Sequence, residues 1–147
     1  IRLITNGSYM SNKSIQEALS LIKNFNHEVW FKIDRVHEED IKITNQVNLS
    51  SSTVKRNLEG SLRVSPTVIQ TCLFKISNKL PSSESIDAYI NFLKLYDKKI
   101  KEIHLYSIAR PSKQPNKIEL SRLSESELKS IEKKMMKVLS TPTKIFA

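Results

Sequence analysis

Polar side chains stand at or near the ends of several apolar stretches of this sequence, and their types suit the binding of a polar ligand. Amide, ammonium, carboxylate and imidazole groups can each exchange hydrogen bonds with a ligand or neutralise its charge. In a parallel α/β sheet the carboxyl ends of the strands meet along one edge, so such groups gather around a common ligand. The candidates are Thr5, Asn6, Lys32, Asp34, Gln70, His104 and Arg110, with Cys72 and Tyr106 on the same stretches.

Several of these candidates also have ordinary structural interpretations. Asn6 precedes Gly7 and suits a turn, and Lys32 and Asp34 suit a surface ion pair. His104 stands between apolar neighbours, where a histidine is more often a hydrogen-bonded core residue than a ligand or a base. The residues alone leave both interpretations open.

The sequence lacks the usual arrangements of catalytic residues. Gln70 suits the pairing of buried backbone groups, and Arg110, which precedes Pro111, suits a surface charge on a restricted turn. Cys72 has no identifiable histidine partner, no serine lies in a nucleophile elbow, and no pair of carboxylates is spaced for acid–base catalysis. The residue pattern therefore predicts ligand binding on an α/β domain and does not specify a reaction.

The stretch 29–35 is a predicted strand on which the rest of the site depends. Its period of two places Trp30, Lys32 and Asp34 on one face and apolar residues on the other. A cation and a carboxylate at the end of a buried strand are costly to desolvate unless they pair or meet a polar ligand.

Strands and helices alternate along the whole chain, which is typical of a parallel sheet with right-handed crossovers. We expect a single α/β domain over residues 1–147, in which 112–147 is a loop and helix extension. The expected strands cover 1–5, 29–35, 67–76 and 100–108. The expected helices cover 11–24, 82–96 and 124–139, and residues 37–60 are expected to form a long loop followed by a helix.

Composition excludes several classes of protein. The chain has 147 residues, of which 39% are hydrophobic, and this fits one soluble domain with an ordinary core. No apolar run reaches the roughly 20 residues of a membrane helix, and no export signal is evident, so we expect a cytoplasmic protein without a membrane partner. One cysteine, Cys72, excludes a disulfide framework and a multi-cysteine metal site made by this chain alone.

The basic balance of the chain leaves a second function open. The 24 Lys and Arg residues exceed the 15 Asp and Glu residues, which permits binding to a polyanion. Tyr9, Trp30 and Tyr106 are possible stacking groups for bases. The lysines are spread over predicted helix faces, however, which favours a solvated surface. A non-catalytic module that binds RNA, such as tRNA, is the alternative function.

Four stretches together resemble the later strands of radical S-adenosylmethionine (SAM) enzymes. They are IRLITNGS (1–8), VWFKID (29–34), TVIQT (67–71) and IHLYSIARP (103–111). The closest similarity is to the iron–sulfur oxidoreductases related to wybutosine synthesis and to glycyl-radical activating enzymes. The order and spacing of the stretches carry the resemblance, since each stretch is short.

The resemblance implies a partial (β/α) TIM-type barrel of about four parallel strands with outer helices, in which the four stretches are the third to sixth strands. It places Thr5, Asn6, Lys32 and Asp34 near the methionine or ribose of SAM. It places Gln70 and His104 further round the cofactor. It also implies that Arg110 binds the substrate or a carboxylate of the cofactor.

The sequence lacks the motifs with which this family binds its iron–sulfur cluster and the amino group of SAM. The CxxxCxxC motif that holds a 4Fe-4S cluster is absent, as is the glycine-rich motif for the SAM amino group. We therefore expect the N-terminal cluster-binding part to be missing and this chain alone to be inactive. For the intact enzyme, the resemblance implies reduction by a flavodoxin or ferredoxin and reductive cleavage of SAM. The resulting 5'-deoxyadenosyl radical would abstract hydrogen from an unidentified substrate.

Overall fold

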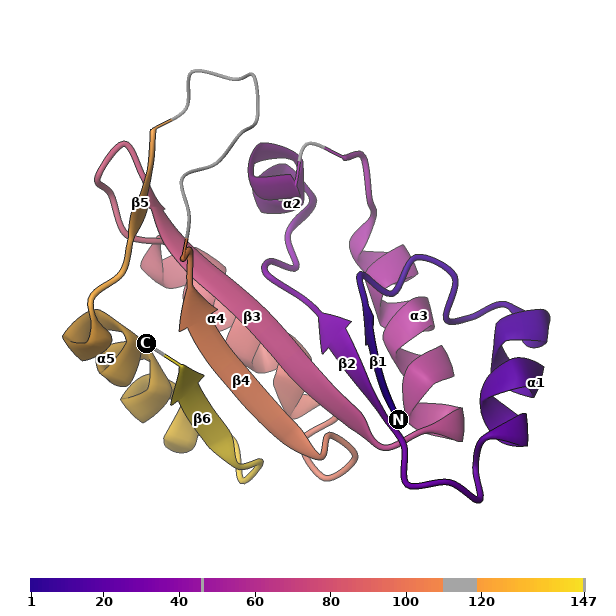
Figure 1. Ribbon diagram of the computed structural model, residues 1–147. Helices are drawn as coiled ribbons and strands as arrows, with labels where there is room; N and C mark the ends of the chain where they lie inside the picture. Colours follow the sequence, from indigo (N-terminus) through magenta and orange to yellow (C-terminus); the bar gives the residue numbers. More distant parts are fainter. Residues whose placement is uncertain (46, 110–118, 147) are drawn as a thin grey trace.

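The computed structural model describes residues 1–45, 47–109 and 119–146, whose strands form one sheet flanked by helices (Figure 1). The strands are β1 (Arg2–Thr5), β2 (Glu28–Lys32), β3 (Thr67–Ile76), β4 (Glu102–Ser107), β5 (Leu120–Arg122) and β6 (Thr143–Phe146). The helices are α1 (Lys13–Leu21), α2 (Glu38–Asn45), α3 (Ser51–Val64), α4 (Ser83–Lys94) and α5 (Glu125–Met136).

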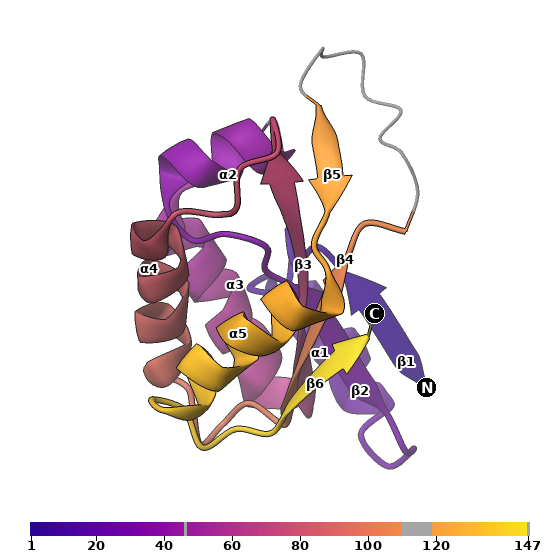
Figure 2. The ribbon, with the colours of Figure 1, turned by 90° about the vertical axis from the view of Figure 1, so that its left-hand side faces the viewer.

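The sheet is parallel except for β5. Its spatial order is β1, β2, β3, β4, β6, and β5 pairs antiparallel with the C-terminal end of β3. Because the spatial order follows the chain order without a reversal, right-handed crossovers place the connecting helices on one face. Figure 2, in which the sheet is turned toward its edge, shows α3 and α4 together on one side of it. Among the described strands, β1 and β6 are the edges, and the sheet is not closed into a barrel.

The helix-covered face of the sheet holds the core. In β2, Val29 and Phe31 are buried, whereas Trp30 is half-buried and Lys32 is exposed, so the two faces differ as the alternation predicts. Ile69 of β3 continues the buried face. The helices cover it with Leu58 of α3, Leu93 of α4, and Leu128 and Met135 of α5.

Two glycines bring the loop after β1 close to the core and to α3. Gly7 has a φ of +80°, and a Cβ there would lie 2.1 Å from Cζ of Phe31. A Cβ on Gly60 of α3 would lie 2.4 Å from the carbonyl oxygen of Met10. Side chains at these positions would therefore displace the loop that follows β1.

The expectation of about four strands is wrong in number, because β5 and β6 add to the sheet in the region expected to be loop and helix. Both strands are short, and β6 comes directly after Pro142, so neither has a clear alternating pattern. The stretch expected to be a long loop also contains α2, in which only Ile41 is buried. No helix in the described residues is long and apolar enough to span a membrane.

Candidate functional site

A row of polar side chains crosses the sheet on the face opposite the helices. Lys32 of β2 is in register with Gln70 of β3, and Gln70 is in register with His104 of β4. Lys144 of β6 continues the row, since it pairs with His104. Three residues proposed from sequence therefore lie side by side on three adjacent strands.

A hollow of about 310 Å³ adjoins this row, a size suited to a small organic ligand. Aromatic rings form much of its wall, and the amide of Gln70 and the guanidinium of Arg122 add polar groups. The Gln70 side chain is half-buried and has no hydrogen-bond partner among the described residues. The lining residues are Trp30, Gln70, His104, Tyr106, Ser107, Ala109, Arg122 and Phe146.

His104 is a buried, partnered residue of the hollow's wall. It is 5% exposed, and its Nε2 lies 2.6 Å from Oε2 of Glu102. Its ring centroid lies 5.1 Å from that of Trp30, edge to face, and 4.8 Å from that of Phe146. Burial alone would raise the pKa of Glu102, but hydrogen bonds from Lys144 and His104 lower it below its ordinary value. His104 is thus held in place between two rings, as the structural interpretation of this residue expects.

Lys32 and Asp34 form an ion pair at the end of β2. Their Nζ and Oδ2 atoms are 3.7 Å apart, and the Asp34 side chain is only 9% exposed. The other carboxylate oxygen, Oδ1, accepts the backbone N–H of Cys72 at 2.8 Å. Asp34 thus joins the end of β2 to β3 just beyond the backbone bond from Ile33 N to Gln70 O.

The Lys32 ammonium also stands close to Tyr106. Burial alone would lower the pKa of Lys32, but the negative charge of Asp34 and the neighbouring Tyr106 raise it above its ordinary value. Lys32 therefore stays a cation and is stabilised in that form by its surroundings. It connects the ion pair at the end of β2 with the hollow that Tyr106 lines.

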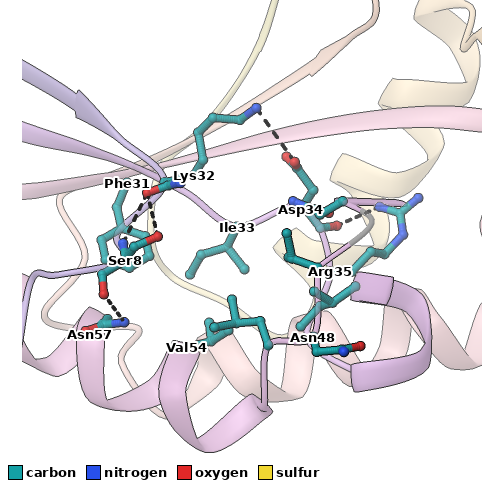
Figure 3. A pocket seen from close by; sticks show the side chains of 14 residues that line it. Ser8, Phe31, Lys32, Ile33, Asp34, Arg35, Asn48, Val54 and Asn57 are labelled. Atoms are coloured by element: carbon teal, nitrogen blue, oxygen red, sulfur yellow. Dashed lines mark hydrogen bonds and ion pairs between the residues drawn. The ribbon is translucent and has the colours of Figure 1, made fainter. Parts of the chain in front are cut away.

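A second pocket of about 210 Å³ lies at the end of β2, between the sheet and α2 and α3. Figure 3 shows Ile33 and Val54 inside it, whereas the Lys32 ammonium extends toward Asp34. Asn6, Lys32 and Asp34 also line this pocket. The residues proposed from sequence thus divide between two cavities, with Gln70 and His104 in the hollow on the open face.

The remaining proposed residues have local roles or lie outside the described part. Asn6 Oδ1 accepts the N–H of Ser8 at 3.1 Å, and Thr5 Oγ1 accepts the N–H of Gly7 at 3.0 Å, so both side chains hold the turn after β1. Arg110 lies outside the described residues.

Arg122 and Phe146 line the hollow but come from parts of the chain in which the sequence analysis placed no candidate. They come from β5 and β6, whose place in the sheet depends on pairing with distant strands. The sequence offered no local signal for either residue. Trp30 and Tyr106, in contrast, follow directly from the alternation of β2 and β4.

The described residues do not fit a 4Fe-4S cluster. Cys72 is the single cysteine of the chain, and such a cluster is held by several thiolates. Burial and the nearby Asp34 carboxylate raise the pKa of Cys72 to about 11, which disfavours the thiolate. No group of three potential metal ligands occurs among residues 1–45, 47–109 and 119–146.

The fold and this geometry define a class of protein: an open, parallel α/β sheet with a ligand-sized hollow on its uncovered face. No protein-family model matches the chain, and no curated protein matches its sequence. A solved structure, that of a radical SAM methyltransferase from Sphaerobacter thermophilus, is similar with a TM-score of 0.58 and 10% sequence identity. The match covers 99% of this chain and 40% of that one, so this chain spans well under half of its neighbour's length. At this identity the match shows a shared fold.

Proposed function

We propose that this chain is the SAM-binding part of a radical SAM iron–sulfur enzyme and that its sheet is part of a (β/α) barrel. The similarity in fold to a radical SAM methyltransferase supports this proposal. The strand order supports it too, because a sheet that winds without reversal has the topology of such barrels. In this proposal residues 1–147 are one domain, and residues 112–147 extend it.

The observation that carries the proposal is the hollow on the open face. Trp30 and Tyr106 offer ring surfaces suited to an adenine. The amide of Gln70, which has no hydrogen-bond partner within the part of the chain that the structure describes, suits the polar edge of a base or a ribose. Lys32 stands at the neighbouring strand end, where it would meet a more polar part of the ligand. These residues bind and orient; SAM, when bound, would supply the adenosyl radical chemistry.

The proposal requires cluster ligands from outside these residues. Cys72 is buried and disfavoured as a thiolate, so no step of cluster chemistry is assigned to it. The substrate and an electron donor such as flavodoxin or ferredoxin remain predictions, as does binding to tRNA.

Trp30 allows a direct test, because it is the single tryptophan of the chain and lines the hollow. We expect SAM to change the Trp30 fluorescence in a saturable way. Gln70→Leu, which removes the amide at similar volume, should weaken SAM binding about fivefold to tenfold, as expected for one hydrogen bond of roughly 1 kcal/mol. Calorimetric titration of the same variants provides an independent measurement.

A variant of the second pocket serves as the control. Asn48→Ala removes an amide from the cavity between the sheet and α2 and should leave SAM binding unchanged. The proposal fails if millimolar SAM leaves both the fluorescence and the calorimetric signal unchanged. A loss of SAM binding in Asn48→Ala but not in Gln70→Leu would indicate that SAM binds in the second pocket instead of the hollow.

A further inference from the structure

Arg122 lines the hollow and comes from a part of the chain in which the sequence analysis predicted no site residue. It is the last residue of β5 and pairs with Phe74 of β3. Alternate residues of a strand share a face, so Phe74 belongs to the same face as Gln70 and Cys72. This pairing brings the exposed guanidinium of Arg122 to the wall of the hollow.

Three acidic side chains in or next to the surrounding elements have cationic partners, whereas Glu119, which directly precedes β5, forms no ion pair among the described residues. The pairs are Glu102 with Lys144 and His104, Asp34 with Lys32, and Glu127 with Lys75. Arg122 has no ion pair and donates no side-chain hydrogen bond within the part of the chain that the structure describes. The hollow thus combines aromatic rings with a cation whose charge no described carboxylate balances.

We propose that Arg122 binds the anionic group of an adenosine-bearing ligand in the hollow, so that the site selects ligands with a carboxylate or a phosphate. The guanidinium presents several N–H donors in a planar fork that fits either group. This inference rests on the proposed function in that the hollow is taken to bind an adenosine-bearing molecule. For SAM the anionic group is the carboxylate of its methionine part, and for a nucleotide it is the phosphate.

Two pairs of probes separate these sources. SAM is compared with decarboxylated SAM, and adenosine 5'-monophosphate is compared with adenosine, each by Trp30 fluorescence and calorimetry. We expect the wild-type chain to bind the anionic member of a pair about tenfold more tightly. This magnitude lies between that of an exposed ion pair and that of a buried charge-assisted bond. Arg122→Gln should remove the preference with little effect on the neutral or decarboxylated probe.

Two further variants test charge and position. Arg122→Lys keeps the charge but not the planar fork, so it should retain part of the preference. Arg56→Gln makes the same change of charge on an exposed part of α3, and it should retain the full preference. Arg122 is exposed on a short strand, so thermal unfolding of its variants should match that of the wild type within a few degrees.

The outcomes distinguish this inference from the proposed function. A preference for SAM that Arg122→Gln abolishes supports both. Selective binding of the monophosphate that depends on Arg122, without binding of SAM, supports the inference and contradicts the proposed function. SAM binding without an anionic preference, or with one that survives Arg122→Gln, overturns the inference alone. If none of the four probes binds, both are wrong.

Discussion

Asp97 anchors the segment that leads into β6, and Phe146 of β6 lines the hollow. Removal of the Asp97 carboxylate should therefore weaken the packing of Phe146 in the wall of the hollow. Asp97 follows α4, and its carboxylate accepts the backbone N–H groups of Ser140 and Thr141 at 2.9 Å each. The hydroxyls of the same two residues lie 2.7 Å from it. These two residues lead directly into β6, so the carboxylate fixes where β6 begins.

We expect Asp97→Ala to lower the free energy of unfolding by about 2 kcal/mol, the range for a hydrogen-bonded charged group whose partners water can partly reach. For a chain of this size that corresponds to a fall of about 4 to 8 °C in melting temperature. The loosened β6 should also weaken ligand binding in the hollow, because Phe146 forms part of its wall. Thermal unfolding and Trp30 fluorescence measure the two effects.

The pH dependence of this contact has a definite sign. Burial would raise the pKa of Asp97, but hydrogen bonds from Ser140 and Thr141 outweigh it and hold the pKa well below its usual range. The stabilisation is therefore complete above the unfolded-state pKa of about 4 and is lost as the pH falls below it. Asp97→Ala should lack this part of the acid destabilisation.

Asp87→Ala is the matched control, since Asp87 is an exposed carboxylate of α4 that forms an ion pair with Lys134 at 2.7 Å and accepts the Ser83 hydroxyl at 3.5 Å. An exposed pair contributes at most about 1 kcal/mol. If Asp97→Ala costs no more than Asp87→Ala, the carboxylate does not fasten β6 and the reasoning is refuted.

Three further predictions concern packing and titration. The hydrogen bond from Lys101 chiefly lowers the pKa of Glu28 from 4.5 to about 2, so its stabilisation is complete above pH 4.5 and is lost toward pH 2. Glu28→Gln should make the melting temperature depend less on pH in that range, and a pH dependence equal to that of the wild type would contradict this. Gly60→Ala should cost about 1 to 3 kcal/mol in chemical denaturation, because the new Cβ meets the Met10 carbonyl; equal or greater stability would show that the loop yields freely. The thiol of Cys72 should react with iodoacetamide far more slowly at pH 8 than free cysteine does, since burial raises its pKa to about 11; rapid alkylation of the folded chain would argue against this burial.

Local signals in the sequence predicted the parallel strands β1 to β4 and the faces they present. The alternation in β2 separates Phe31 from Trp30, and β3 covers the expected stretch. The helix expected over 124–139 begins at α5, where Ser124 and Glu127 form a capping box. Each of these features depends on residues close together in the chain, which is why they could be derived from it.

The features that the sequence did not predict depend on distant partners. β5 exists because it pairs with the end of β3, and β6 exists because it pairs with β4 and is held by Asp97. A strand of three or four residues has too few positions to show a period. The division of the candidate residues between two cavities was equally hidden, since side chains at one strand end can turn to either face of the sheet.

The winding of the sheet bears on where a ligand can bind. In doubly wound α/β proteins the ligand occupies the crevice where the strand order reverses. In the described strands the order from β1 to β6 has no reversal, so that crevice does not arise. Parallel sheets ordinarily have both faces covered, yet here aromatic and charged side chains such as Trp30 and Lys32 occupy the face opposite the helices. A ligand bound against that face would cover part of it, which is the physical reason to look for the binding site there.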